Sequence, residues 1–191
     1  MKTIGYAAHS SDAHMVPYHF ERRNLRDNDV AIEILYSGVC HSDLHTVNGD
    51  WGDQPYPLVP GHEIVGKVIE VGADVKNYKV GQHVAVGCMV DSCQSCDQCD
   101  HGEEQFCRNG MTPTYGAPDR ISGEITQGGY SKHIVVREEF VLNVPESLDL
   151  ARTAPILCAG ITTFSPLRTW GVKEGSRVGV IGLGGLGHMA V

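Results

Sequence analysis

The 191-residue chain lacks several features that would place it in a specialised class of protein. No segment approaches the ~20 consecutive apolar residues of a membrane span. Residues 1–16 contain neither a long apolar run nor a signal-peptide cleavage pattern. Basic residues do not dominate, because 15 Lys and Arg stand against 23 Asp and Glu, for a formal net charge of −8. We therefore expect no nucleic-acid partner, no membrane partner and a cytoplasmic location.

Internal repeats and low-complexity stretches are also absent. A complete set of disulfides is excluded as well, because it requires an even number of cysteines. The chain has seven cysteines, an odd number. In a reducing compartment, clustered thiols are more often metal ligands than disulfide partners. The clustered cysteines are therefore candidate metal ligands.

The hydrophobic pattern predicts a mainly β fold with some α-helix. The first ~150 residues contain short apolar runs broken by glycine and proline, a pattern typical of a barrel or sandwich. The clearest expected strands are 30–36, 64–71, 82–86 and 133–136.

The character of the sequence changes after Pro145. Residues 151–170 are rich in helix formers, and we expect Pro155 and Pro166 to break this helix. Residues 177–181 are expected to form a buried strand. A single strand cannot cover its own apolar faces, so we expect Val178, Val180 and Ile181 to be incompletely packed.

Four cysteines lie close together in the run DSCQSCDQCDHGEEQFC. They are Cys93, Cys96, Cys99 and Cys107. Four thiolates complete the tetrahedral shell of one zinc ion and leave no open position, so the spacing predicts a structural zinc site.

A second candidate metal site combines residues that are distant in the sequence. Cys40 follows an expected strand, His62 precedes another, and Cys158 lies in the expected helical region. Two thiolates and one imidazole form a three-ligand set that leaves the fourth position of a zinc ion open. Each residue taken alone is more often a buried core residue than a ligand, and the sequence does not show that the three meet.

A glycine-rich motif stands near the last residue. Gly182, Gly184 and Gly187 fit the pattern GxGxxG, which is weak evidence alone in a chain with 23 glycines. Here it follows an apolar run, as a dinucleotide-binding turn requires. Gly182 would make the tight turn, Gly184 would admit the pyrophosphate, and Gly187 would let helix pack on strand. The further βα units of a dinucleotide fold do not follow in this chain.

Several motifs together resemble the zinc-dependent medium-chain dehydrogenase/reductase family of alcohol dehydrogenases. The matching stretches are GVCHSDLH, YPLVPGHEIVG, VGCMVDSCQSCDQC, TQGGYSKHIVV, LCAGITTFSPL and GLGGLGH. The resemblance is to the cinnamyl alcohol dehydrogenase branch, and it runs from about Val30 to the last residue of the chain, covering only the amino-terminal portion of such enzymes.

The resemblance implies a domain organisation. Residues 1–153 would form a GroES-like β-barrel catalytic domain, with a structural zinc lobe at 88–110. Residues 154–191 would begin a Rossmann dinucleotide-binding domain, truncated after its first strand and the start of its helix.

The resemblance also implies roles for individual residues. Cys40, His62 and Cys158 would bind a catalytic zinc, and Glu63 would be a carboxylate able to approach it. Asp43 would accept a hydrogen bond from His62. Ser42 would hold the substrate oxygen and pass its proton, through the cofactor ribose, toward His45. The cofactor would contact Thr162, Gly182, Gly184, Gly185, Leu186 and Gly187, and the substrate pocket would include Trp51 and Cys88.

The expected function is hydride transfer between primary alcohols or aldehydes and NADP(H), with NADP preferred over NAD through the branch resemblance alone. The alternative is a truncated, catalytically inactive zinc-binding fragment, and we expect the isolated chain to bind two zinc ions but not the cofactor. A zinc-ribbon nucleic-acid module conflicts with the acidic balance. A zinc-free quinone reductase relative would lack Cys40, His62 and the four-cysteine lobe. Full-length relatives are usually homo-oligomeric.

Overall fold

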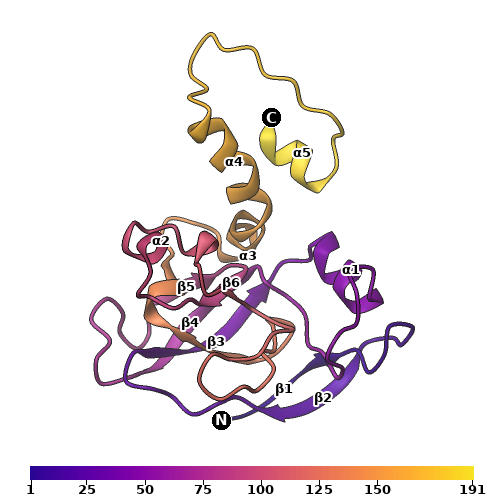
Figure 1. Ribbon diagram of the computed structural model, residues 1–191, viewed down its shortest axis with the longest axis vertical. Helices are drawn as coiled ribbons and strands as arrows, with labels where there is room; N and C mark the ends of the chain where they lie inside the picture. Colours follow the sequence, from indigo (N-terminus) through magenta and orange to yellow (C-terminus); the bar gives the residue numbers. More distant parts are fainter.

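A computed structural model describes the whole chain, residues 1–191. The chain forms a rounded, β-rich body from which a helical arm projects, and the carboxyl terminus lies on this arm (Figure 1). The architecture is mainly β with some helix, as the sequence predicts. No helix has the length and apolar character that crossing a membrane would require.

An antiparallel sheet of five strands forms the centre of the body. Its strand order is β8-β3-β4-β5-β9, where the strands are β3 (Asp29–Ser37), β4 (Ile64–Val71), β5 (His83–Val86), β8 (His133–Arg137) and β9 (Leu142–Asn143). All the strands expected in the first 150 residues belong to this sheet and are confirmed. The apolar runs form strands because both faces of the central strands are covered.

Two hydrophobic clusters cover the two faces of this sheet. The larger cluster contains Val30, Ile32, Ile34, Ile64, Val68, Val84, Val86, Ile134, Val136, Phe140 and Val141. The smaller contains Val65, Ala85, Val144, Ala154 and Leu157. Successive side chains of a strand point to opposite faces, so Ile64 and Val65 belong to different clusters. The smaller cluster fastens the start of the helical arm to the sheet.

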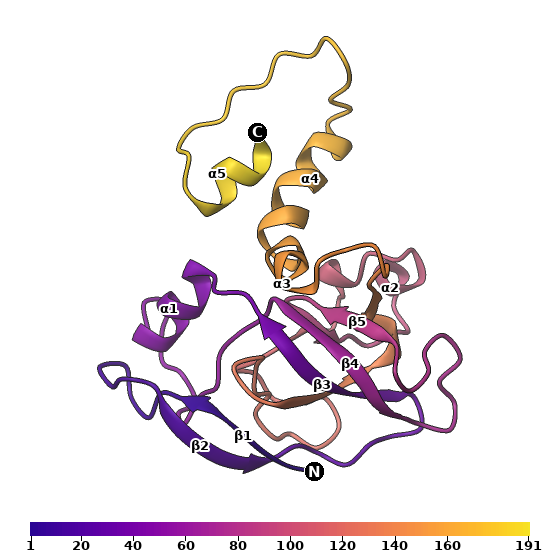
Figure 2. The same cartoon turned by 180° about the vertical axis from the view of Figure 1, so that it is seen from behind.

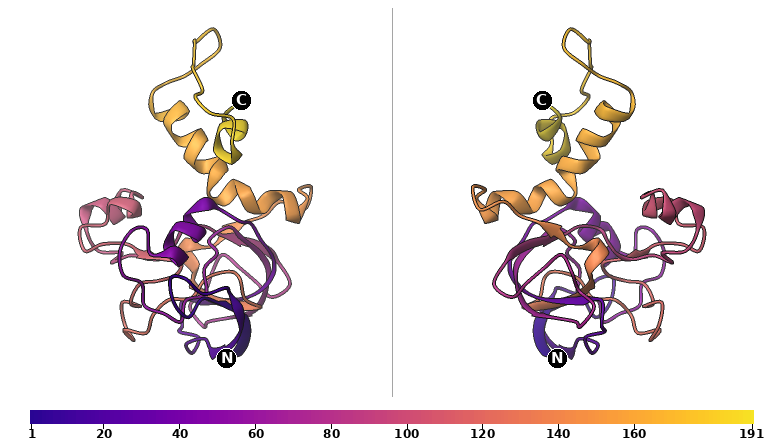
Figure 3. Two further views of the ribbon diagram at one scale, coloured as in Figure 1. Left: turned by 90° about the vertical axis from the view of Figure 1, so that its right-hand side faces the viewer. Right: turned by 90° about the vertical axis from the view of Figure 1, so that its left-hand side faces the viewer.

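Two short ribbons flank the central sheet. The pair β1 (Lys2–Ala7) and β2 (Val16–Glu21) was not expected from the sequence. The pair β6 (Met89–Asp91) and β7 (Thr112–Pro113) brackets the cysteine-rich segment, which contains α2 (Asp97–Asp100) and the 3₁₀-helix η1 (Glu104–Phe106). This segment stands out from the body as a separate lobe (Figure 3).

The remaining helices include α1 (His41–Asn48), η2 (Glu138–Phe140) and α3 (Leu150–Thr153). They are followed by η3 (Ala154–Leu157), α4 (Ala159–Thr169) and α5 (Gly185–Ala190). The expected break at Pro155 is confirmed, because this residue lies in η3 between two α-helices. The expected break at Pro166 is wrong. A proline lacks only its own N–H, and the N–H of Trp170 still donates to Pro166 O at 3.0 Å, so the last turn of α4 is intact.

The expected buried strand at 177–181 is also wrong. These residues have no regular secondary structure, and the Ile181 side chain is fully exposed. A strand is stabilised by hydrogen bonds to a neighbouring strand, and none lies beside this segment. The incomplete packing expected of Val178, Val180 and Ile181 is confirmed, since all three are exposed.

Close packing between β3 and β4 gives a first prediction. A Cβ atom at Gly66 would lie 2.3 Å from the carbonyl oxygen of Glu33 and 2.5 Å from Ile32 Cγ2. Overpacking of this kind costs about 1–3 kcal/mol. We expect Gly66→Ala to lower the urea midpoint of unfolding clearly. Gly179→Ala is the matched control, because a Cβ there meets nothing within 4 Å. Equal midpoints for the two variants would contradict this account of the sheet.

Candidate functional site

Three separate segments of the chain meet at the top of the sheet and bring four possible metal ligands together. Cys40 ends the connection from β3 to α1, His62 and Glu63 lie just before β4, and Cys158 lies between η3 and α4. One ligand atom from each residue lies within 4.8 Å of those of the others. Figure 2 shows the end of β3, the start of β4 and the base of the helical arm converging at this place.

The beginning of α1 fixes the position of Cys40. This residue is the N-cap of the helix, with an extended backbone at φ −110° and ψ 149°. The carboxylate of Asp43, three residues later, accepts a hydrogen bond from the backbone N–H of Cys40 at 3.1 Å. This is the capping arrangement in which the side chain of the third helical residue satisfies the N-cap amide. Cys40 therefore stands at a rigid, well-defined point.

Asp43 also orients His62. The His62 Nδ1 lies 2.9 Å from Asp43 Oδ1, and the N–H of Gly61 donates to the same oxygen at 3.0 Å. A carboxylate can only accept, so Nδ1 carries the proton and the lone pair of Nε2 is free for a metal. Burial opposes the charge on Asp43. Hydrogen bonds from His62 and from Tyr130 outweigh that effect and hold the pKa of the carboxyl below its usual value.

The donor set fits a zinc ion. Two sulfur atoms bound to one tetrahedral zinc at about 2.3 Å stand about 3.8 Å apart. Cys40 Sγ and Cys158 Sγ are 3.8 Å apart. Burial, followed by the charge of Cys40, raises the pKa of the Cys158 thiol to about 12. A bound cation would favour ionisation of both thiols, because it offsets the repulsion between two neighbouring thiolates.

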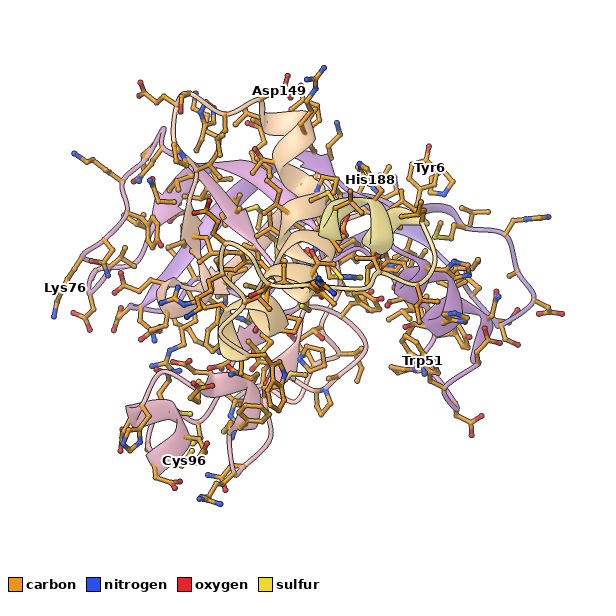
Figure 4. All side chains as sticks on the ribbon, turned by 90° about the horizontal axis from the view of Figure 1, so that it is seen from above. Tyr6, Trp51, Lys76, Cys96, Asp149 and His188 are labelled. Atoms are coloured by element: carbon orange, nitrogen blue, oxygen red, sulfur yellow. The ribbon has the colours of Figure 1, made fainter.

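The four cysteines of the lobe form a second group whose sulfur atoms lie within 4.8 Å of one another (Figure 4). The distance from Cys99 Sγ is 3.6 Å to Cys96 Sγ and 3.9 Å to Cys93 Sγ. The backbone N–H of Cys93 also donates to Cys107 Sγ. Hydrogen bonds from Asn109 and Ser95 lower the pKa of Cys93 to about 5. The spacing and the N–H donors suit four thiolates around one zinc.

Ser42 and His45 both lie on α1, one turn apart. No hydrogen bond joins their side chains. His45 Nδ1 lies 2.7 Å from Asp50 Oδ2, and its ring stacks on His41 with the ring centroids 4.7 Å apart. The Asp50 contact was not predicted from the sequence, because it depends on the turn after α1.

The remaining expected residues occupy different surroundings. Trp51 is exposed, with its ring 5.3 Å from that of His45, and it is labelled in Figure 4. Cys88 is exposed as a residue. Burial of its thiol raises the pKa of Cys88, and the charges of Cys40 and Glu63 add to this effect. Thr162 is exposed on α4, one turn beyond Cys158, whose carbonyl accepts its N–H at 3.0 Å.

The glycine-rich segment forms a turn and a helix start without the strand. Gly182 has a left-handed backbone, with φ +83°, and a Cβ at Gly187 would lie 1.8 Å from the Gly182 carbonyl oxygen. Both positions therefore require glycine. Gly184 is the N-cap of α5, Gly185 begins it, and Leu186 is exposed.

Two tyrosines beside the possible metal ligands were not predicted from the sequence. The Tyr130 hydroxyl donates to Asp43 Oδ2 at 2.8 Å. The Tyr115 ring lies 6.0 Å from the His62 ring. Tyr130 stands in the motif TQGGYSKHIVV, but nothing in that motif indicates that its hydroxyl reaches Asp43.

A cavity lies away from this site. It measures about 490 Å³ and lies between β2, residues 55–57 and residues 114–127. It shares no residue with either group of possible metal ligands. We therefore take the convergence of ligands, and not the cavity size, as the mark of the functional site.

Comparison with known proteins gives consistent matches. Residues 26–146 match the family described as alcohol dehydrogenase GroES-like domain. The chain is 54% identical over its whole length to NADP-dependent alcohol dehydrogenase C 1 of Mycolicibacterium smegmatis, and it covers 55% of that protein. It is 50% identical to the probable cinnamyl alcohol dehydrogenase 3 of Oryza sativa, covering all of this chain and 52% of that protein.

Solved structures agree with these matches. The cinnamyl alcohol dehydrogenase of Helicobacter pylori, complexed with NADP(H), superposes with a TM-score of 0.96 at 46% identity, covering all of this chain and 55% of that one. A cinnamyl alcohol dehydrogenase of Sorghum bicolor gives a TM-score of 0.95 at 45% identity, covering all of this chain and 54% of that one. The chain thus spans about half the length of the relatives it matches, and aligns with their amino-terminal portion. The resemblance seen in the sequence motifs is confirmed, and the chain belongs to the alcohol dehydrogenase family that carries the GroES-like domain.

Proposed function

We propose that this chain forms the zinc-binding catalytic domain of an NADP(H)-dependent dehydrogenase that interconverts primary alcohols and aldehydes. The observation that carries the proposal is the meeting of Cys40, His62 and Cys158, with the His62 Nε2 left free by Asp43. This set has three strong ligands and room for a fourth. The relatives named as NADP-dependent alcohol dehydrogenases support the reaction and the cofactor.

The two metal sites have different roles in this proposal. The four cysteines of the lobe close the coordination shell of their zinc, which stabilises the lobe. At the open site, bound zinc supplies Lewis-acid polarisation of the substrate oxygen. Glu63, a buried carboxylate in the same group, is close enough to share in binding the metal.

The residues of α1 handle the proton. The Ser42 hydroxyl would accept a hydrogen bond from the alcohol, and His45, three residues later on the same helix, would take up the proton nearer to solvent. Asp50 holds the His45 ring in place through the 2.7 Å contact between His45 Nδ1 and Asp50 Oδ2. Since His45 is part-exposed, it can release the proton to water.

The other assignments follow the family. Residues 1–153 would be the GroES-like domain, with the structural lobe at 88–110, and 154–191 would begin the Rossmann domain. Thr162 would face the nicotinamide, and Gly182, Gly184, Gly185, Leu186 and Gly187 would lie against the pyrophosphate. Trp51 and Cys88 would border the pocket for a small alcohol or aldehyde. A cytoplasmic location and a homo-oligomeric assembly remain part of the same proposal.

A second candidate is a zinc-binding chain that does not catalyse by itself. The observation that favours it is the exposed segment before α5, where Ile181 and Leu183 have no sheet to pack in. A dinucleotide-binding turn needs a strand to hold its glycines in place. In this reading the chain binds zinc, and catalysis requires further structure to order residues 177–184.

Metal content tests the two sites separately. We expect two zinc ions per chain, measured by native mass spectrometry and elemental analysis. Cys158→Ser removes one ligand of the open site, and Cys99→Ser removes one from the lobe, so each variant should retain one zinc. Cys88→Ser is the control and should retain two. A single zinc in the unaltered chain would remove the basis of the proposed function.

Cofactor binding separates the two candidates. Because residues 177–183 lack a sheet, we expect the 191-residue chain to show no saturable NADPH binding in the micromolar range, measured by fluorescence titration. The zinc-loaded chain is used, so that loss of metal does not explain the result. Tight, saturable binding would exclude the non-catalytic candidate.

The proton path is tested in a hybrid in which residues 1–191 are joined to the remaining part of NADP-dependent alcohol dehydrogenase C 1. Alcohol oxidation is followed through the absorbance of NADPH. We expect Ser42→Ala to lower kcat by about a hundredfold, within the range for loss of acid–base catalysis. His45→Gln should have a smaller effect, because water can also accept the proton.

His41→Gln serves as the control for these variants. Its ring stacks on His45 but has no proposed part in proton transfer. The hybrid carrying this change should retain its rate. If Ser42→Ala is as active as the unaltered hybrid, the proton does not pass through the Ser42 hydroxyl.

A further inference from the structure

Tyr130 is held beside the metal ligands by its backbone. Residues 128–130 run alongside residues 59–61. The N–H of Gly129 donates to Gly61 O at 2.8 Å, and the N–H of Tyr130 donates to Pro60 O at 2.9 Å. The segment that leads into β8 is thereby tied to the segment that carries His62.

The Tyr130 ring packs directly on Gly61. That glycine has a left-handed backbone, with φ +102°, and a Cβ there would lie 2.7 Å from Tyr130 Cδ1. No other residue would leave space for the ring. The fit of ring against backbone aims the hydroxyl at Asp43, where it donates to Oδ2 at 2.8 Å.

The Asp43 carboxylate is fully used in this arrangement. Its Oδ1 accepts from Gly61 and His62, and its Oδ2 accepts from Cys40 and Tyr130. A carboxylate has about four acceptor positions. With only 3% of the residue exposed, water cannot replace a lost donor. Among the four donors, Tyr130 alone comes from the β8 side of the site.

Tyr130 acts as the donor in this bond, because an ionised carboxylate has no proton to give. Burial and the nearby charge of Asp43 raise the pKa of Tyr130 well above its usual value, so the hydroxyl keeps its proton. The hydrogen bond from Tyr130 holds the Asp43 carboxylate in the orientation in which Oδ1 faces His62 Nδ1. The lone pair of Nε2 therefore stays directed at the other ligands.

We propose that Tyr130 is a positioning residue for the metal ligand His62, acting through Asp43 from the far side of the site. This inference rests on the proposed function, since it concerns the open zinc site. It adds Tyr130 to the expected hydrogen-bonded pair of Asp43 and His62. Without the hydroxyl, Oδ2 keeps one donor, the carboxylate can turn, and the His62 ring is less well aimed.

Tyr130→Phe in the full chain tests the inference, because it removes the hydroxyl and keeps the ring that packs on Gly61. The affinity for zinc at the open site is measured by competition with a chromophoric chelator. Cobalt substitution then reports the ligand geometry through its visible spectrum. Partners that contact a metal ligand directly are worth about 10–100-fold in metal affinity. We expect a loss of about tenfold, a shifted cobalt spectrum and an unchanged zinc in the lobe.

Two further variants make the result decisive. Tyr56→Phe also removes a part-buried tyrosine hydroxyl, which donates to Val47 O in α1 at 2.6 Å, but it does not touch Asp43. It should keep the affinity and the spectrum of the unaltered chain. Asp43→Asn should lose more affinity than Tyr130→Phe, because it disturbs both oxygens.

The inference is overturned if Tyr130→Phe keeps the original zinc affinity and cobalt spectrum, or if Tyr56→Phe changes them equally. If the unaltered chain binds zinc only at the lobe, the proposed function fails first, and the role of Tyr130 fails with it. The zinc count of the unaltered chain therefore distinguishes the two failures.

Discussion

The buried carboxylate of Asp43 is the constraint on which the site depends. It receives hydrogen bonds from the start of α1, from the turn before β4 and from the segment before β8. A buried charge without partners is costly, so these segments must all be in place for the fold to contain Asp43 at all. The Asp43 carboxylate can thus be buried only when Cys40 and His62 are in this geometry. The interactions that hold these segments of the fold together therefore also form the site.

Cys158 reaches the site by a different force. No ion pair or polar network comparable to that of Asp43 holds it. Instead, Ala154 and Leu157 of η3 pack with Val65 and Ala85 on one face of the sheet. Apolar burial therefore places Cys158, while hydrogen bonding places Cys40 and His62. The 3.8 Å separation of the Cys40 and Cys158 sulfur atoms joins these two parts of the structure at one point.

The sequence predicted the strands and motif residues that a local pattern marks. It did not predict the contacts that depend on how neighbouring segments pack. Continuous apolar runs identified β3, β4, β5 and β8, because a strand that is covered on both faces can be recognised from such a run. The segment 177–181 has the same pattern, yet it forms no strand, since an apolar run cannot supply its own hydrogen-bonding partner. The motifs indicated Cys40, His62 and Cys158, whereas the contacts of Tyr130 and Asp50 arise from turns that bring distant residues together. Such contacts leave no periodic signal in the sequence.

The two groups of thiols depend on a cation in different ways. In the lobe, α2 and η1 are single turns of four and three residues. Helices this short are not stable alone in water, and the lobe has no core cluster of its own. Its zinc would therefore supply much of its folding free energy. Around Cys40, His62 and Cys158, by contrast, the sheet and the hydrogen bonds of Asp43 hold the side chains in position. The fold itself therefore bears the cost of assembling this group of side chains, whereas the lobe would depend on its zinc.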